Sequence, residues 1–313
     1  MKMHALDGAP HYARPDQHPI ALSIVKAVVA SNAAAAASER FDGIHFDNEP
    51  HVLLDWRVPQ LREPLLADYL AFNTRAAAMA REGGLAYGVD VPLWWPAMPQ
   101  LLRIVDNLGI MDYRTTAAGP DGIVAHATDT LREAEKLGRS RVHIGVETSV
   151  ERRDYLFLLG VPREAIDAAI VSRTPSAALL GRYRARLVDD GTLVHVGVEL
   201  AGGEEALTGI ARAFGVTTSA NPVAAAAAAQ AAFRNEGEWF DIRPRTIRAG
   251  AATFAAASAT LMTPPKVTFA GRSLSEMNRA LEQAETAFGD YRSYAGIAIH
   301  DYLAFRRLAD AGR

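Results

Sequence analysis

The sequence predicts an α/β fold: a (β/α)8 TIM-type barrel, complete or incomplete at the N-terminus, with an inserted α/β subdomain. Three observations support this fold class. Six short segments alternate apolar residues with small or polar ones and end on a polar residue. Helix-like segments separate them, which is typical of a parallel sheet with helical crossovers. The alternation stops between residues 151 and 263, which indicates an insertion.

The clearest of these strands has an apolar face and a chemically reactive face. Successive side chains of a strand point to opposite sides, so Ile44 and Phe46 share one face. His45, Asp47 and Glu49 share the other. We expect helices to cover the apolar face and the polar face to line the mouth of the barrel. A solvated edge strand is the alternative, and the recurrence of the pattern favours the barrel.

Five further segments follow the same pattern, with apolar residues predicted to face outward and small or polar residues inward. Leu6 is expected to face out, for example, with Ala5 on the inner face. The polar inward residues at the ends of segments 5–7, 85–92, 107–114, 142–148 and 296–301 are Asp7, Asp90, Tyr113, Glu147 and His300. Small inner residues below polar tips leave space for a ligand.

The predicted organisation is one barrel interrupted by a subdomain. Residues 1–150 form the first part of the barrel, residues 151–263 the inserted α/β subdomain, and residues 264–313 the last part. The helices that alternate with the strands are predicted at 19–37, 61–82, 99–106, 122–138 and 273–288. A barrel needs eight strands. With six found, either the insertion supplies the missing strands or the chain begins after the first two.

Inside the insertion, local signals predict a strand and two helices. Asp190 and Gly191 mark a turn before a strand at 192–200, and a helix follows at 203–214. Asn221 is a typical N-cap, followed by proline at the first helical position, so a second helix is expected from there to Phe233.

Composition and charge exclude several classes of protein. A formal net charge of −3 without a cluster of Lys and Arg gives no electrostatic footprint for nucleic acid. The sequence contains no run of about 18 apolar residues, so it predicts no membrane-spanning helix. Without cysteine there is no disulfide or thiolate chemistry. No cofactor is expected. As written the chain lacks a signal peptide and is expected to be cytoplasmic, or exported if the true N-terminus lies upstream; its oligomeric state is unknown.

The segment from Asp42 to Glu49 resembles the fourth-strand signature of the chitinase-like barrels of glycoside hydrolase family 18, Asp-x-x-Asp-x-Asp-x-Glu. Asp42, Asp47 and Glu49 match, and His45 replaces the second aspartate. The resemblance implies that Glu49 protonates the departing glycosidic oxygen and that Asp47 orients a substrate 2-acetamido group. No metal is implied.

Two other strands extend this resemblance, which covers residues 1–150 and 264–313 in the order of strands three to eight. The segment from Met111 resembles the family's sixth-strand Met-x-Tyr-Asp, with Tyr113 matching and Arg114 departing. Tyr113 would hydrogen-bond the acetamido group. His300 lies in the last strand, where these enzymes usually place tryptophan.

The triplet Asn48, Glu49, Pro50 also looks like the fourth-strand Asn-Glu-Pro of the large clan of retaining glycosidases. In that scheme Glu49 is the acid/base and Glu147 the nucleophile, with carboxyl groups roughly 5 to 5.5 Å apart. Both resemblances assign Glu49 the same role. Glu147 could equally be an ion-pair partner for Arg114 or for a histidine.

Further residues are candidates for binding the substrate. Trp94 and Trp95 are expected to form an aromatic platform for a sugar, with a plug for the barrel as the alternative. The complete set of predicted substrate-binding residues is Asp7, His45, Asp90, Trp94, Trp95, Arg114 and His300.

The sequence thus predicts a probable glycosidase that binds a carbohydrate or glycoconjugate substrate. Two other classes compete with this hypothesis. In the first, His45, Asp47, Glu49 and His51 hold a metal ion for hydrolysis, with His11, Asp90, His143 or His300 completing the ligands. In the second, the barrel binds a glycan without cleaving it.

Overall fold

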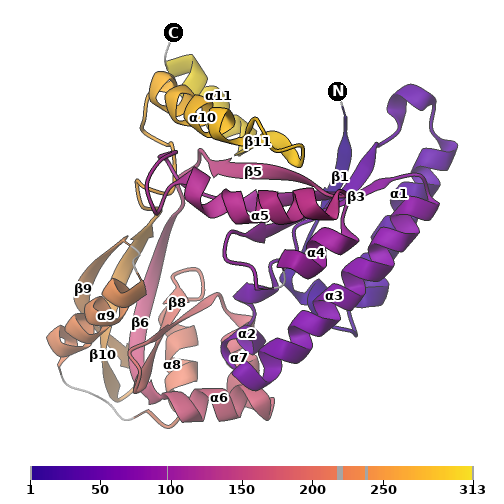
Figure 1. Ribbon diagram of the computed structural model, residues 1–313. Coiled ribbons are helices and arrows are strands. Elements are labelled where there is room, and N and C mark those ends of the chain that lie inside the picture. The colour runs from indigo at the N-terminus through magenta and orange to yellow at the C-terminus, as the bar shows by residue number, and fades with distance from the viewer. Residues whose placement is uncertain (1, 97, 217–220, 237–238, 312–313) are drawn as a thin grey trace. The chain divides into compact units, whose positions relative to one another are not determined.

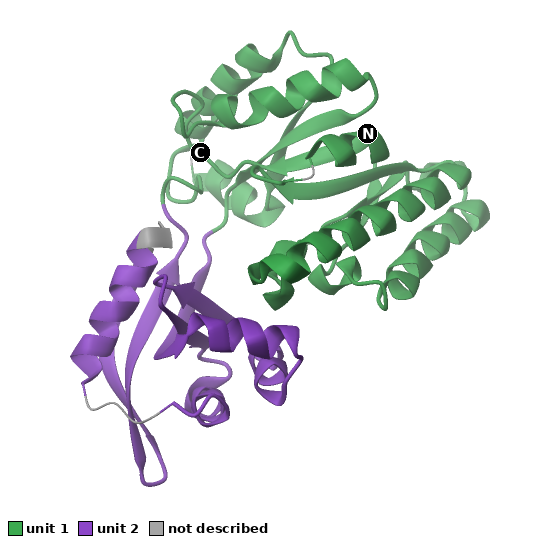
Figure 2. Ribbon diagram, turned by 60° about the horizontal axis from the view of Figure 1, so that its bottom comes forward, with its two compact units in different colours: residues 1–149, 265–313 green, residues 150–264 purple. Residues whose placement is uncertain are grey.

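The computed structural model describes residues 2–96, 98–216, 221–236 and 239–311. The chain divides into two compact units, which Figure 2 colours separately. Unit 1 comprises residues 1–149 and 265–313, and unit 2 comprises residues 150–264. Each unit has its own sheet.

Unit 1 is built on a parallel sheet of six strands whose spatial order follows the chain. The strands are β1 (His4–Asp7), β2 (Gly43–Phe46), β3 (Ala86–Pro92), β4 (Asn107–Met111), β5 (Arg141–Glu147) and β11 (Tyr294–His300). All six predicted strands are therefore present, and every neighbouring pair is parallel. The sheet is open between β1 and β11, so an eight-stranded barrel is not formed by the described residues. The insertion does not supply the missing strands, because its strands pair with one another.

Helices alternate with these strands (Figure 1). They are α1 (His18–Ala34), α2 (Leu54–Arg57), α3 (Pro59–Glu82), α4 (Met98–Ile104), α5 (Ile123–Leu137), α10 (Leu274–Phe288) and α11 (Tyr302–Ala311), with 3₁₀ helices η1 (Pro10–Ala13), η2 (Ala37–Glu39) and η3 (Pro50–Val52). The five predicted helices are confirmed, with α1 ending before the end of the alanine run. A capping box between Ser273 and Glu276 starts α10. None of the described helices is long and apolar enough to cross a membrane.

The core of unit 1 lies between the helices and one face of the sheet. The outward residues predicted on β2 to β5 are buried there, including Ile44, Phe46, Val89 and Ile144, all 0 % exposed. This confirms the assigned faces of those strands. Burying these side chains contributes roughly 1.5–3 kcal/mol each.

The prediction for the faces of β1 was wrong. Leu6 pairs with His45 and Ala5 with Ile44, and paired residues of adjacent strands share a face. Leu6 therefore lies on the inner face, where it is 70 % exposed, while Ala5 packs against the core. At the open edge of the sheet nothing covers the larger side chain, so apolar character did not identify the buried face.

Unit 2 is an antiparallel sheet with helices. The strand order is β7 (Ala185–Asp189), β8 (Leu193–Glu199), β6 (Arg152–Pro162), β10 (Ala252–Met262) and β9 (Trp239–Ala249). The helices are α6 (Arg163–Val171), α7 (Pro175–Arg182), α8 (Gly203–Ala213) and α9 (Pro222–Glu236). The predicted strand and both helices are confirmed, and the Asn221 side chain accepts hydrogen bonds from the amides of Val223 and Ala224. The sequence did not predict β6, β9 or β10.

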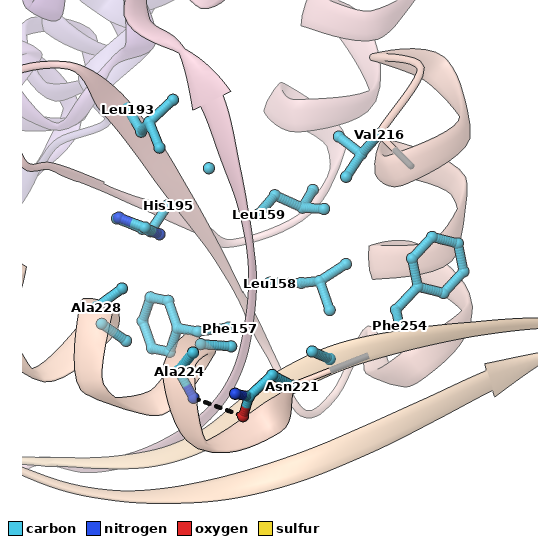
Figure 3. A pocket seen from close by; sticks show the side chains of 14 residues that line it. Phe157, Leu158, Leu159, Leu193, His195, Val216, Asn221, Ala224, Ala228 and Phe254 are labelled. Carbon is cyan, nitrogen blue, oxygen red and sulfur yellow. Dashed lines mark hydrogen bonds between the residues drawn. The ribbon is translucent and has the colours of Figure 1, made fainter. Parts of the chain in front are cut away.

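A cavity of about 290 Å³ in unit 2 lies between α9 and the sheet (Figure 3). Its lining is mainly apolar and includes Phe157, Leu158 and Phe254. The imidazole of His195 also borders the cavity. Nε2 of this ring lies 3.2 Å from the Asp190 carboxylate.

Candidate active site

Tyr113, two residues after the end of β4, is affected by polar residues from several strands. Burial raises the pKa of the Tyr113 hydroxyl, and the negative charges of four carboxylates raise it further. In decreasing order of effect these are Glu147, Asp47, Asp90 and Glu49. They come from the carboxyl ends of β5, β2 and β3, so side chains far apart in sequence act on one phenol. The convergence of the strand tips stays a prediction, and this shared effect on one phenol supports it.

Glu49 lies beyond the end of β2 in a strained backbone conformation. Its φ is 34° and its ψ is 54°, the left-handed region, which costs a non-glycine residue about 1–2 kcal/mol. Pro50 then starts η3. Because β2 ends at Phe46, strand alternation does not direct this side chain, contrary to the prediction. Such strain is frequent where a fold positions a functional group.

Glu49 contacts His51, whose Nε2 lies 3.3 Å from Oε2. Burial lowers the pKa of His51 to about 4, so this imidazole is neutral near neutral pH. A neutral ring can donate one hydrogen bond to the Glu49 carboxyl without placing a full positive charge beside it. The Glu49 carboxyl therefore lies beside a neutral hydrogen-bonding group.

Asp47 differs from Glu49 in its electrostatic environment. Burial, followed by the charge of Asp90, raises the pKa of Asp47 to about 6, although His45 and His300 oppose the shift. Its Oδ1 is buried and has no hydrogen-bond partner among the described residues. A buried carboxyl oxygen without a donor favours the protonated form of the group. Below about pH 6 Asp47 can thus donate a hydrogen bond to a ligand.

Glu147 and His300 form a pair at the ends of β5 and β11. Nδ1 of His300 lies 2.9 Å from Oε2 of Glu147, and the amide of Ser149 donates to Oε1 at 2.6 Å. Burial works in the opposite direction, but these hydrogen bonds lower the pKa of Glu147. The His300 ring also stacks on Tyr113, with centroids 6.2 Å apart. Glu147 is therefore an ionised carboxylate, and a histidine rather than Arg114 pairs with it.

His45 and Asp90 form the third pair, on the inner wall below Asp47. Nε2 of His45 lies 3.0 Å from Oδ1 of Asp90. The glycines of the next strands provide the space: a Cβ at Gly88 would lie 2.3 Å from the His45 ring, and one at Gly109 would lie 1.9 Å from the Asp90 carboxylate. Any larger residue there would displace the pair.

The two adjacent tryptophans, both of which contact His51, have different roles. Trp94 is 53 % exposed and packs against His51 with centroids 5.3 Å apart. Trp95 is 4 % exposed, stacks on Trp56 at 5.2 Å and meets Tyr69 edge-on. Trp94 is thus available to a sugar ring, whereas Trp95 is the plug that the alternative predicted.

Two predicted binding residues, Arg114 and Asp7, do not contact the carboxylates and histidines of the candidate site in the described ranges. The Arg114 guanidinium donates to Asp121 at 2.9 Å and to the carbonyl of Tyr113 at 2.8 Å, so it fixes the loop after β4. Asp7 is in register with Phe46, on the helix-covered face. Its charge and a hydrogen bond add to burial in raising the pKa of Tyr12. The prediction that Asp7 faces inward was wrong, because it rested on the inverted faces of β1.

Sequence reasoning gave too little weight to two residues. His51 was considered only as a metal ligand, although its position two residues after Glu49 was the available signal. Asp112 was not singled out: its side chain is fully buried, and its Oδ1 lies 2.9 Å from Nδ1 of His126 on α5. This pair anchors the residue before Tyr113. Asp42, which matches the chitinase-like signature, instead accepts the amide of Met3 at 2.7 Å.

No group of three or more His, Cys, Asp or Glu residues in the described ranges has the geometry to hold a metal ion. The carboxylates are instead divided among histidine pairs, with Glu49 on His51, Asp90 on His45 and Glu147 on His300. The arrangement suits proton transfer and hydrogen bonding to a ligand.

The chain matches no family model and no curated protein. Among solved structures it is similar to a chitinase from Chromobacterium violaceum ATCC 12472, with 20 % identity over 66 % of each chain and a TM-score of 0.30. It is also similar to the Group IV chitinase of Ostrinia furnacalis in complex with allosamidin. That match has 12 % identity, covers 96 % of this chain and 72 % of that chain, and has a TM-score of 0.39. The spore cortex-lytic enzyme SleL of Bacillus megaterium QM B1551 matches at 13 % identity over 95 % of this chain and 53 % of its own, with a TM-score of 0.33. The structures that this chain resembles are thus chitinases and a spore cortex-lytic enzyme.

Proposed function

We propose that unit 1 acts as a glycoside hydrolase, with Glu49 as the general acid/base. The observation that supports the proposal is that the charges of Glu49, Asp47 and Glu147, which follow two different strands, all raise the pKa of Tyr113. Glycoside hydrolysis requires one carboxyl that transfers a proton and a second that is ionised. The strained backbone and neutral His51 partner of Glu49 suit the first role.

The other groups take roles that follow from their protonation. Glu147, whose pKa is lowered, is the candidate nucleophile or electrostatic stabiliser. Asp47, protonated below about pH 6, orients the substrate by donating a hydrogen bond to an acceptor oxygen. Tyr113 donates from its hydroxyl. Trp94 presents an exposed ring to a sugar face next to the Glu49 site.

Aryl glycosides with different leaving groups test the role of Glu49. The substrates are 4-methylumbelliferyl and 2,4-dinitrophenyl β-glycosides of glucose, N-acetylglucosamine and its dimer. General acid catalysis contributes about 10²–10⁴-fold. Glu49→Gln should therefore lower kcat/KM by about that factor for the poorer leaving group, and much less for dinitrophenolate, which departs without a proton. Glu147→Gln should slow both substrates, since an ionised carboxylate assists each.

The exposed Glu39 on η2 offers a matched control, and Glu39→Gln should leave both rates unchanged. A rate that does not respond to Glu49→Gln would contradict the proposed acid. If the protein binds N-acetylglucosamine oligomers without cleaving them, and the Glu49→Gln variant binds equally well, unit 1 is a glycan-binding protein.

A further inference from the structure

The cavity of unit 2 lies between the sheet and the N-terminal half of α9 (Figure 3). Small side chains of this half line it, including Ala224 and Ala228. The C-terminal half of the same helix packs closely: the Phe233 ring stacks on Phe240 with centroids 3.7 Å apart and meets Phe157 edge-on at 4.6 Å. Protein interiors seldom leave voids larger than a water molecule. A space of about 290 Å³ beside such close packing is therefore a candidate ligand site.

An irregularity in β6 shapes the sheet side of this cavity. The pairing of β6 with β8 shifts in register between Leu158 and Gly160, and Leu159 between them has a φ of 95°, which non-glycine residues rarely adopt. Leu159 is 8 % exposed and lines the cavity. A Cβ at Gly160 would lie 2.6 Å from the Leu193 side chain, so glycine gives Leu193 its place at the cavity wall. Bulges and strained residues of this kind often accompany functional sites.

A histidine borders this apolar space. His195 is 7 % exposed, and its Nε2 lies 3.2 Å from Oδ2 of Asp190. Backbone hydrogen bonds from Leu193 and Thr192 lower the pKa of Asp190, so its carboxylate is ionised near neutral pH and can only accept. Nε2 of His195 is therefore the donor, and in the neutral ring Nδ1 is an acceptor. Within the described ranges no residue forms a hydrogen bond with Nδ1.

We propose that the unit 2 cavity binds a small apolar molecule with one hydroxyl group, such as an alkylphenol, whose hydroxyl donates a hydrogen bond to the His195 imidazole. The volume lies at the lower end of the roughly 300–1,000 Å³ of ligand pockets, which suits a single substituted ring. A sugar does not suit this site, because its hydroxyl groups would lose their hydrogen bonds to water among apolar side chains. The cavity is lined by unit 2 residues, so the proposal does not depend on the function of unit 1.

Calorimetric titration of the full chain tests the proposal with 4-ethylphenol and with 4-ethyltoluene, in which a methyl group replaces the hydroxyl. The phenol should bind at one site per chain. His195→Phe replaces the imidazole with an apolar ring, so the ratio of the phenol affinity to the toluene affinity should fall about tenfold, the effect of one buried hydrogen bond. Comparing this ratio between the two proteins cancels the difference in hydrophobicity between the ligands.

Two variants of α9 test whether the ligand lies in the cavity. Ala228→Leu places a larger side chain at the cavity wall and should weaken the binding of both ligands about tenfold or more. Ala227→Leu makes the same change at an exposed position of the same helix, away from the cavity, and should leave both affinities unchanged. Nitrogen-15 NMR of the unaltered chain needs no variant: 4-ethylphenol should shift the Nδ1 resonance of His195, and 4-ethyltoluene should leave it in place.

The absence of saturable 4-ethylphenol binding would overturn the proposal, and so would an unchanged affinity in the Ala228→Leu variant. An affinity ratio that stays the same in His195→Phe, with an Nδ1 resonance that does not respond to the phenol, would overturn the role of the hydroxyl group. Backbone amide spectra establish that each variant is folded. Because no glycoside is cleaved in these measurements, their outcome is independent of the proposed function.

Discussion

Nδ1 of His300 lies 2.9 Å from Oε2 of Glu147, although 153 residues separate the two in sequence. The hydrogen bond that His300 donates to Glu147 raises the pKa of His300, and despite the opposing effect of burial the pKa of Glu147 is lowered. Each group thus stabilises the charged form of the other. The contact joins the end of β11 to β5, so it also fixes the last strand of the sheet.

This pair predicts a pH-dependent contribution to stability. The lowered pKa of Glu147 stabilises the fold above its ordinary 4.5, and the raised pKa of His300 stabilises it below its ordinary 6.5. His300→Gln should therefore lower the free energy of unfolding most between these two values. We expect less than about 1 kcal/mol, because the His300 side chain is 61 % exposed and solvent screens it. Urea unfolding at several pH values measures this, and a difference independent of pH would contradict it.

The raised pKa of Asp47 predicts that this residue makes the fold less stable as the pH rises. Its pKa is raised from 3.8 to about 6, so the folded state binds the proton more tightly and stability falls as the pH rises through this window. Asp47→Asn should consequently stabilise the protein above pH 6, by about 1–2 kcal/mol after allowing for partial solvent screening, while lowering glycoside turnover. Urea unfolding near pH 4 and near pH 7.5 provides the comparison. Equal effects at both pH values would contradict a raised pKa.

The periodicity of the sequence predicted which face of a strand is buried where that strand has a neighbouring strand on each side. The buried Ile44 and the inner His45 follow directly from alternation on β2. The same reasoning failed at Leu6, because β1 is a four-residue edge strand whose inner face is open. In unit 2, β10 was missed because its run of alanines is also typical of a helix.

The candidate site was predictable to the extent that it depends on strand ends. Asp90 and Glu147 are placed by the strands that carry them, and the charges of both raise the pKa of Tyr113. The pairs of His45 with Asp90 and of His300 with Glu147 were not predictable, because these contacts join residues on separate strands. The left-handed backbone of Glu49 also lies outside any periodic pattern.

Removal of Asp112 should destabilise unit 1. Its side chain is fully buried and contacts His126 on α5, so Asp112→Ala leaves Nδ1 of a partly buried imidazole without its carboxylate, while Nε2 keeps Asp121 at 3.5 Å. We expect a loss of about 3 kcal/mol in the free energy of unfolding. The control on α5 itself is Asp129→Ala, whose side chain is 93 % exposed and which should change stability by less than about 0.5 kcal/mol. Similar values for the two variants would show that the buried pair contributes little.

The different exposures of Trp94 and Trp95 predict that Trp94 contributes to ligand binding and Trp95 to stability. Trp95 is 4 % exposed and packs between Trp56 and Tyr69, so Trp95→Ala should cost about 3–5 kcal/mol of unfolding free energy. Trp94 is 53 % exposed, so Trp94→Ala should change stability by less than about 1 kcal/mol while weakening the binding of an N-acetylglucosamine oligomer about tenfold. Urea unfolding and calorimetric titration of both variants measure the two effects. Unchanged oligomer affinity in the folded Trp94→Ala variant would remove this ring from the binding site and leave His51, against which it packs, as its structural partner.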